Sequence, residues 1–215
     1  MTRRFAQCSA GVVVLTLAIT VAYAGGWSII TVHDVPDYSI AGRSLTLTFS
    51  VRQHGNNLLE GLRPTVRATT PQGLETNAIA TPAKGNGEYS ATLNFPQPGE
   101  WSIRIDGGFN PEDKTRSFNA VTLLPLKVVR NDQEAPVVSK STRGAHLFVA
   151  KGCVGCHNSE GKLDLTQKQF GSEYLKKFLA DPSSVRKVDM PNLNLKEDEI
   201  ASLSAYLTGS VFKQR

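Results

Sequence analysis

The stretch Cys153-Val154-Gly155-Cys156-His157 restricts this chain more than any other feature, because its two thiols and its imidazole follow one another at a fixed, short spacing. Two cysteines separated by two residues can reach the two vinyl groups on one edge of a haem and form thioethers. The next residue, His157, can then donate an imidazole nitrogen to the iron. The pattern predicts one covalently attached haem c, with Cys153, Cys156 and His157 as binding residues and His157 as a metal ligand.

A zinc half-site and a redox-active Cys-x-x-Cys pair are the alternatives for this motif. A zinc ribbon normally needs a second pair of Cys or His ligands, whereas the third of the three cysteines in this chain, Cys8, stands near the N-terminus. A thioredoxin-like site belongs in a βαβ context, which the flanking sequence does not indicate. The haem interpretation is therefore favoured.

Residues 141–209 resemble the class I cytochrome c family. The matching stretches are GAHLF at 144–148, the Cys-x-x-Cys-His motif, DMPNL at 189–193 and the apolar positions between 199 and 207. The resemblance implies a small all-α cytochrome c domain at residues 141–215. It also implies that Gly144 and Phe148 pack against a C-terminal helix.

Met190 is the predicted sixth ligand of the iron. The chain has two methionines, and the other one, Met1, would be lost with an export signal. Met190 is followed by Pro191, as in the family, and proline stiffens a ligand loop. The alternatives are that Met190 only fills the core or that His146 is the ligand. A thioether opposite an imidazole leaves no open position on the iron, which favours electron transfer over catalysis.

Three helices are expected around the motif. The first is capped by Ser141 or Thr142 and runs to about Lys151. The second begins at Ser172 and is stopped at 181–182 by the pair Asp-Pro. The third follows 196 and carries Ile200, Leu203 and Leu207 on one face. Lys196 stands where the family often has a Ser or Thr cap, which makes the start of the third helix uncertain.

Residues 1–24 have the pattern of a cleaved secretory signal. Arg3 and Arg4 precede a short apolar run, and Ala-Tyr-Ala at 22–24 resembles a cleavage site. An uncleaved anchor is the alternative. The protein is therefore predicted to be exported, in a periplasmic or other extracytoplasmic location, with association with a membrane as a further option.

Residues 25–130 are predicted to form an all-β, immunoglobulin-like sandwich, so that the fold class is multidomain, with a sandwich followed by the all-α cytochrome c domain. Leucine, phenylalanine and valine alternate with polar residues through 44–51, which is the period of a half-buried strand. About seven such stretches are separated by turn signals. GEY at 87–89 and GEW at 99–101 resemble the YtkA/FixH-like exported sandwich proteins. Tyr89 and Trp101 are expected in the core, and His33 and His54 as ordinary polar residues, with a copper site as the alternative.

Residues 131–140 combine mixed charge, one proline and no periodicity, and they are predicted to be a short linker. The net charge is +5, and the sequence contains no long basic run, so nucleic-acid binding has no support.

The predicted function is that of an exported monohaem electron carrier and not of an enzyme. Its electron donor and acceptor would be redox proteins, and the sandwich would be a docking module. The alternatives are a cytochrome subunit of a membrane-bound terminal oxidase or dehydrogenase complex, and a haem-based sensor or metallochaperone.

Overall fold

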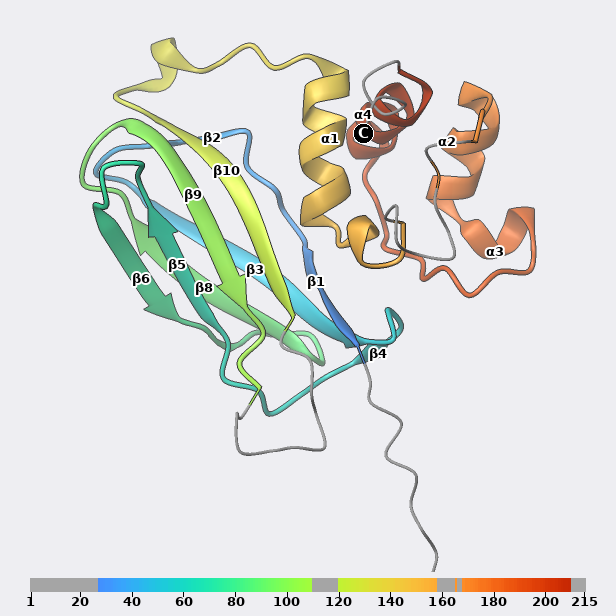
Figure 1. The fold of residues 1–215 in the computed structure, drawn as a ribbon, viewed down its shortest axis with the longest axis horizontal. Coiled ribbons are helices and arrows are strands. Elements are labelled where there is room, and N and C mark those ends of the chain that lie inside the picture. Colours follow the sequence, from blue (N-terminus) through green and yellow to red (C-terminus); the bar gives the residue numbers. More distant parts are fainter. Residues whose placement is uncertain (1–26, 110–119, 158–164, 166–167, 210–215) are drawn as a thin grey trace, which may run out of the picture.

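The computed structural model describes residues 27–109, 120–157, 165 and 168–209. Within these residues, two sheets face each other and a group of short helices lies against one side of them (Figure 1). The predicted signal at 1–24 lies outside the described residues. The element bounds follow, sheet by sheet.

The first sheet has the order β1-β3-β8-β7, with β4 paired to β3. Its strands are β1 (Ser28–Val32), β3 (Ser44–Gln53), β4 (Asn57–Leu58), β7 (Thr81–Pro82) and β8 (Glu88–Asn94). The second sheet has the order β2-β10-β9-β5-β6. Its strands are β2 (Tyr38–Ile40), β5 (Thr65–Thr69), β6 (Glu75–Ile79), β9 (Gly99–Asp106) and β10 (Val121–Val129). All pairings are antiparallel except that of β2 with β10.

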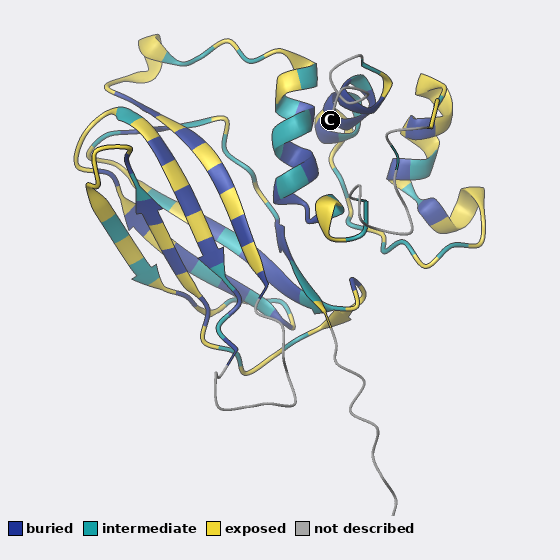
Figure 2. Ribbon diagram, viewed as in Figure 1, coloured by how far each residue is buried: buried dark blue, intermediate teal, exposed yellow. Residues whose placement is uncertain are grey.

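Strands β5, β8, β9 and β10 bury every second residue along most of their length, and this alternation is visible along β9 and β10 in Figure 2. Each strand therefore turns one apolar face inward, and the inner faces of the two sheets make a shared core. Within this core the rings of Phe49 and Tyr89 lie 6.1 Å apart, and those of Phe95 and Trp101 lie 5.2 Å apart edge to face. The prediction of a sandwich with Tyr89 and Trp101 in its core is confirmed.

Helices follow β10. After a short turn, η1 (Asp132–Glu134), they are α1 (Lys140–Ala150), η2 (Cys153–Gly155), α2 (Ser172–Ala180), α3 (Pro182–Val185) and α4 (Glu197–Thr208). The cap of α1 is Ser139 rather than Ser141 or Thr142, because the Ser139 hydroxyl accepts from the backbone N–H of Thr142. Helix α4 begins after Lys196 although this residue has no capping hydroxyl, because the Glu199 carboxylate accepts from the Lys196 backbone N–H.

Helices α1 and α4 cross at a glycine. A Cβ on Gly144 would lie 2.0 Å from the backbone oxygen of Ser202, so only glycine allows this approach. One turn further on, the ring of Phe148 lies 5.6 Å from that of Tyr206. The predicted packing of Gly144 and Phe148 against the C-terminal helix is therefore confirmed.

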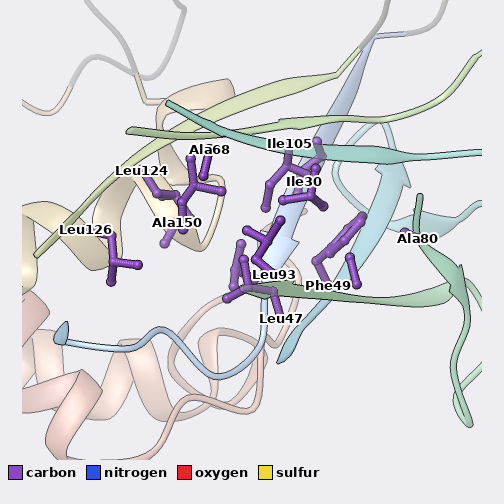
Figure 3. Packing of buried hydrophobic residues seen from close by; sticks show 14 of the residues in the cluster. Ile30, Leu47, Phe49, Ala68, Ala80, Leu93, Ile105, Leu124, Leu126 and Ala150 are labelled. Atoms are coloured by element: carbon purple, nitrogen blue, oxygen red, sulfur yellow. The ribbon is translucent and has the colours of Figure 1, made fainter. Parts of the chain in front are cut away.

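The prediction of a separate all-α cytochrome c domain is wrong. In the described residues the chain is mostly β-sheet, and the first of its few short helices, α1, docks on the sandwich. Ala150, at the end of α1, belongs to the core of the sandwich (Figure 3), and Val149 packs against that core. Val35, after β1, contacts both this core and the cluster between the helices. The physical reason is that α1 buries two faces: Leu147 and Phe148 face the other helices, and Ala150 faces the sheets.

Candidate functional site

The Cys-x-x-Cys-His segment begins where α1 ends. Gly152 reverses the chain with a φ of +78°, and a Cβ at this position would lie 2.7 Å from the backbone oxygen of Ile30 in β1. Glycine is required here both by the left-handed backbone and by the close approach of the sandwich. The turn η2 follows, in which the backbone oxygen of Cys153 accepts from the N–H groups of Cys156 and His157 at 3.2 and 2.9 Å. Both cysteines and the histidine are therefore held on one compact turn.

The thiols of Cys153 and Cys156 are both free of disulfide bonds and half-buried. Burial raises the pKa of Cys153 to about 12, with a smaller contribution from the neighbouring Cys156. Burial also raises the pKa of Cys156. Both groups are consequently thiols at neutral pH, the form that a thioether-forming addition to a vinyl group consumes.

One apolar cluster between the helices contacts both Cys153 and Met190. Its buried members are Leu147, Phe148, Leu175, Leu179, Leu203, Tyr206 and Leu207. Cys153 and Met190 are half-buried at its border, together with Leu165 and Phe170. The ring of His157 lies 6.5 Å from that of Phe148, a member of the cluster. The structure thus brings Cys153, His157 and Met190 around the same apolar residues, although they are up to 37 positions apart in the sequence.

His146 lies elsewhere. It lines a small cavity between α1 and the sandwich, with Val35, Pro36, Leu47, Ile103, Leu124, Pro125 and Leu126 as the other lining residues. Its Nε2 is buried without a hydrogen-bond partner, and burial lowers the pKa of the ring, an effect that Arg143 reinforces and Asp37 opposes. His146 therefore faces the sheets rather than the cluster that holds Met190, and nothing in its position favours it as an iron ligand.

The sandwich contacts the Cys-x-x-Cys-His segment directly. A Cβ added to Gly155 would lie 2.2 Å from Cγ2 of Ile29 in β1. On the turn between β3 and β4, a Cβ added to Gly55 would lie 3.9 Å from Sγ of Cys156. The same turn reaches the stretch before Met190, because the side-chain amide of Asn56 donates to the backbone oxygen of Asp189 at 3.2 Å. These contacts could not be predicted from the sequence, because glycines and an asparagine in a turn have an ordinary local explanation.

A buried ion pair stands immediately before the motif. Nζ of Lys151 lies 2.8 Å from Oε1 of Glu199, and both side chains are only 4% exposed. Lys151 also donates to the backbone oxygen of His33, which follows β1. Since Glu199 belongs to α4, this lysine joins the sandwich, the end of α1 and the start of α4 at one point. Nothing in the local sequence pattern predicts that a lysine beside the motif is buried.

Two further cations connect the 33–37 loop of the sandwich to the helices. Arg143 of α1 lies 2.8 Å from a carboxylate oxygen of Asp37 and 2.9 Å from one of Asp198. Lys196 lies 2.6 Å from a carboxylate oxygen of Asp34, and this contact lowers the pKa of Asp34. These pairs are partly or largely exposed, so each one stabilises the junction only weakly.

The two histidines of the sandwich are separated from each other. Nε2 of His33 lies 2.7 Å from the Ser50 hydroxyl, and Nδ1 lies 3.4 Å from the Glu88 carboxylate. His54 is exposed on the β3–β4 turn, and its ring lies 6.1 Å from that of Trp27. Across the described ranges, no three His, Cys, Asp or Glu side chains are grouped so that they could hold a metal ion.

No helix in the described part of the chain is long and apolar enough to cross a membrane.

Residues 24–106 match the model of a protein family described as YtkA-like. A search of curated proteins found no match. Solved structures similar to the chain include the Lin-41 filamin domain, at 17% identity and a TM-score of 0.36, covering 48% of this chain and 93% of that one. They also include the ZirS C-terminal domain, at 11% identity and a TM-score of 0.32, covering 60% and 84%. A third is a superoxide reductase (neelaredoxin) from Ignicoccus hospitalis, at 13% identity and a TM-score of 0.29, covering 51% and 86%. None of these comparisons supports a cytochrome c domain.

Proposed function

We propose that this protein binds one haem c covalently through Cys153 and Cys156, with His157 and Met190 as axial ligands, and that it transfers single electrons between redox proteins. We further propose that it works outside the cytoplasm, after export directed by residues 1–24. The YtkA-like sandwich would serve as the platform that carries the haem site. The separate all-α domain implied by the class I cytochrome resemblance is not part of this proposal.

The observation that carries the proposal is the contact of Cys153 and Met190 with one apolar cluster, beside which His157 also lies. A His/Met haem c needs two thiols for its thioether links, and an imidazole and a methionine thioether for its iron. The residues between them are leucines, phenylalanines and a tyrosine, which match the apolar faces of a porphyrin. The residues present therefore fit the cofactor.

The donor set favours electron transfer over catalysis. A bound haem supplies reversible one-electron chemistry at its iron, and a thioether opposite an imidazole raises its reduction potential. His157 and Met190 would hold the iron together, and a site held by both would leave no vacant position for a substrate or a diatomic ligand. The described residues contribute packing and ligation around this centre.

Covalent attachment can be tested directly. The full-length protein is produced with a cytochrome c maturation system, denatured and extracted with acidified organic solvent. Haem should stay with the polypeptide, and it should leave with the solvent in Cys153→Ser/Cys156→Ser. Cys8→Ser, which removes only the remaining cysteine, is the matched control and should retain the haem. Extraction of all haem from the unaltered protein would contradict the proposal.

The carrier role has its own test. The ferrous protein should bind carbon monoxide slowly or not at all, and the ferric protein should show the weak far-red band of a sulfur-to-iron bond. Met190→Ala should remove that band and open the iron to carbon monoxide. Rapid binding of carbon monoxide by the unaltered protein would instead indicate an open site, and with it a sensor or an enzyme.

A further inference from the structure

The turn between β3 and β4 contacts both segments that carry the proposed axial ligands. Gly55 approaches the Cys-x-x-Cys-His segment, since a Cβ at this position would lie 3.9 Å from Sγ of Cys156. The next residue, Asn56, donates from its side-chain amide to the backbone oxygen of Asp189 at 3.2 Å. That oxygen belongs to the peptide group that joins Asp189 to Met190.

The turn itself is well anchored in the first sheet. The backbone N–H of Asn56 donates to the oxygen of Gln53 at 3.2 Å, and that of His54 donates to the oxygen of Trp27 at 2.9 Å. His54 and Gly55 both have positive φ angles, +53° and +78°. This backbone is unfavourable for His54 and easy for Gly55. Because β3, which leads into the turn, pairs with β1, and β4, which follows the turn, pairs with β3, the sandwich sets the backbone position of Asn56.

We infer that Asn56 is a positioning residue for the distal ligand: it holds the backbone next to Met190 in register with the Cys-x-x-Cys-His segment. This inference rests on the proposed function, since it assigns a role to Asn56 only if His157 and Met190 bind the iron. It makes the sandwich part of the haem site, because one turn of the sheet approaches the proximal segment at Gly55 and donates a hydrogen bond to the distal segment from Asn56.

The contribution of this hydrogen bond to Met190 ligation can be measured. The bond is exposed to solvent, so its loss should raise the ratio of iron without Met190 to iron with Met190 by about two- to fivefold. Asn56→Ala removes the donor. Asn56→Asp keeps the size of the side chain but places a carboxylate oxygen against the Asp189 carbonyl, so the effect should be larger than with alanine.

The experiment uses the full-length, haem-loaded protein and compares Asn56→Ala and Asn56→Asp with Asn57→Ala. Asn57 is the next residue, is also an exposed asparagine and lies in β4. Three properties are measured: haem retained after acid extraction, intensity of the far-red sulfur-to-iron band, and the fraction of ferrous protein that binds carbon monoxide. Thermal unfolding of each variant shows whether the fold is intact.

All variants should retain the haem fully. The far-red band should weaken, and carbon monoxide binding should increase, most in Asn56→Asp and less in Asn56→Ala. Asn57→Ala should equal the unaltered protein in both measurements. If the Asn56 variants keep the haem but match the unaltered protein in both optical measurements, the inference is wrong and the proposed function stands. If the unaltered protein holds no haem or lacks the sulfur-to-iron band, the proposed function fails first. An equal change in Asn57→Ala would show a general effect of the turn and would also overturn the role given to Asn56.

Discussion

Lys151 and Glu199 form an ion pair of 2.8 Å whose two side chains are each 4% exposed. The pair connects the residue that ends α1 to the first turn of α4, and Lys151 additionally donates to the His33 backbone oxygen in the sandwich. A charge in such a place is tolerated only because its partner and its hydrogen bonds are present. The pair is therefore a sensitive point of the junction between the sheets and the helices.

Removing one member of this pair should be strongly destabilising. Lys151→Met leaves the Glu199 carboxylate buried without its cation, and we expect a loss of about 3–5 kcal/mol in the free energy of unfolding. The double variant Lys151→Met/Glu199→Leu should recover most of that loss, because no charge is left uncompensated. Urea denaturation measures both. Lys176→Met is the matched control: its partner Glu173 is 78% exposed, so it should change the free energy by about 0–1 kcal/mol.

The crossing of α1 and α4 should not tolerate a methyl group. Gly144→Ala places a Cβ 2.0 Å from the Ser202 backbone oxygen, and the helices must move apart, which should cost about 1–3 kcal/mol. Gly171→Ala is the control, because a Cβ there meets nothing within 4 Å. Unfolding midpoints of the two variants should therefore differ clearly, and similar midpoints would show that the helices slide at little cost.

The protein should lose stability as the pH falls below about 6.5, the ordinary pKa of histidine. The pKa of His146 is lowered in the folded state, mainly by burial. The unfolded chain therefore binds more protons than the folded one in this window, and stability rises with pH through it. His146→Leu, which removes the unpartnered Nε2 from an apolar cavity, should flatten the pH dependence of the free energy of unfolding between pH 5 and 7.

His33 supplies the comparison for that experiment. Its pKa is also lowered, first by burial, while Glu88 acts in the opposite direction. His33→Gln should thus remove a separate part of the same pH dependence. A slope that is unchanged in both variants would assign the effect to other groups.

Before haem attachment, the Cys153 thiol should react slowly with alkylating reagents. Thiolate is the reactive form, and burial raises the pKa of Cys153 to about 12. In haem-free Cys8→Ser protein at pH 8, Cys153 should be modified more slowly than in the same protein unfolded by urea. Peptide mass spectrometry after timed quenching measures each cysteine. Equal rates in the folded and unfolded protein would mean that the segment is open.

Much of the local structure could be predicted from the sequence, because its signals are local. The alternation through 44–51 located β3, and Ser172 and the Asp-Pro pair at 181–182 bounded α2. The short strands β2, β4 and β7 have too few residues to show a period.

The relation between the two halves could not be predicted, because it depends on contacts between distant positions. Ala150 carries no distinguishing signal as an alanine at a helix end, yet it is part of the core of the sandwich. Asn56 and Asp189 are 133 residues apart. The family resemblance implied an all-α domain. It could not show that β1 and the β3–β4 turn lie against one side of the helical segment.

The docking of α1 on the sandwich has a consequence for kinetics. A module on a free tether can swing between a donor and an acceptor, and its turnover then depends on the length of the tether. Here the segment after residue 140 is held by Ala150 in the core and by the Lys151 ion pair, so the proposed electron carrier would have to diffuse as a whole molecule for each exchange of partners. Shortening or lengthening residues 131–138 should accordingly leave electron-exchange rates unchanged, whereas ionic strength and protein concentration should control them.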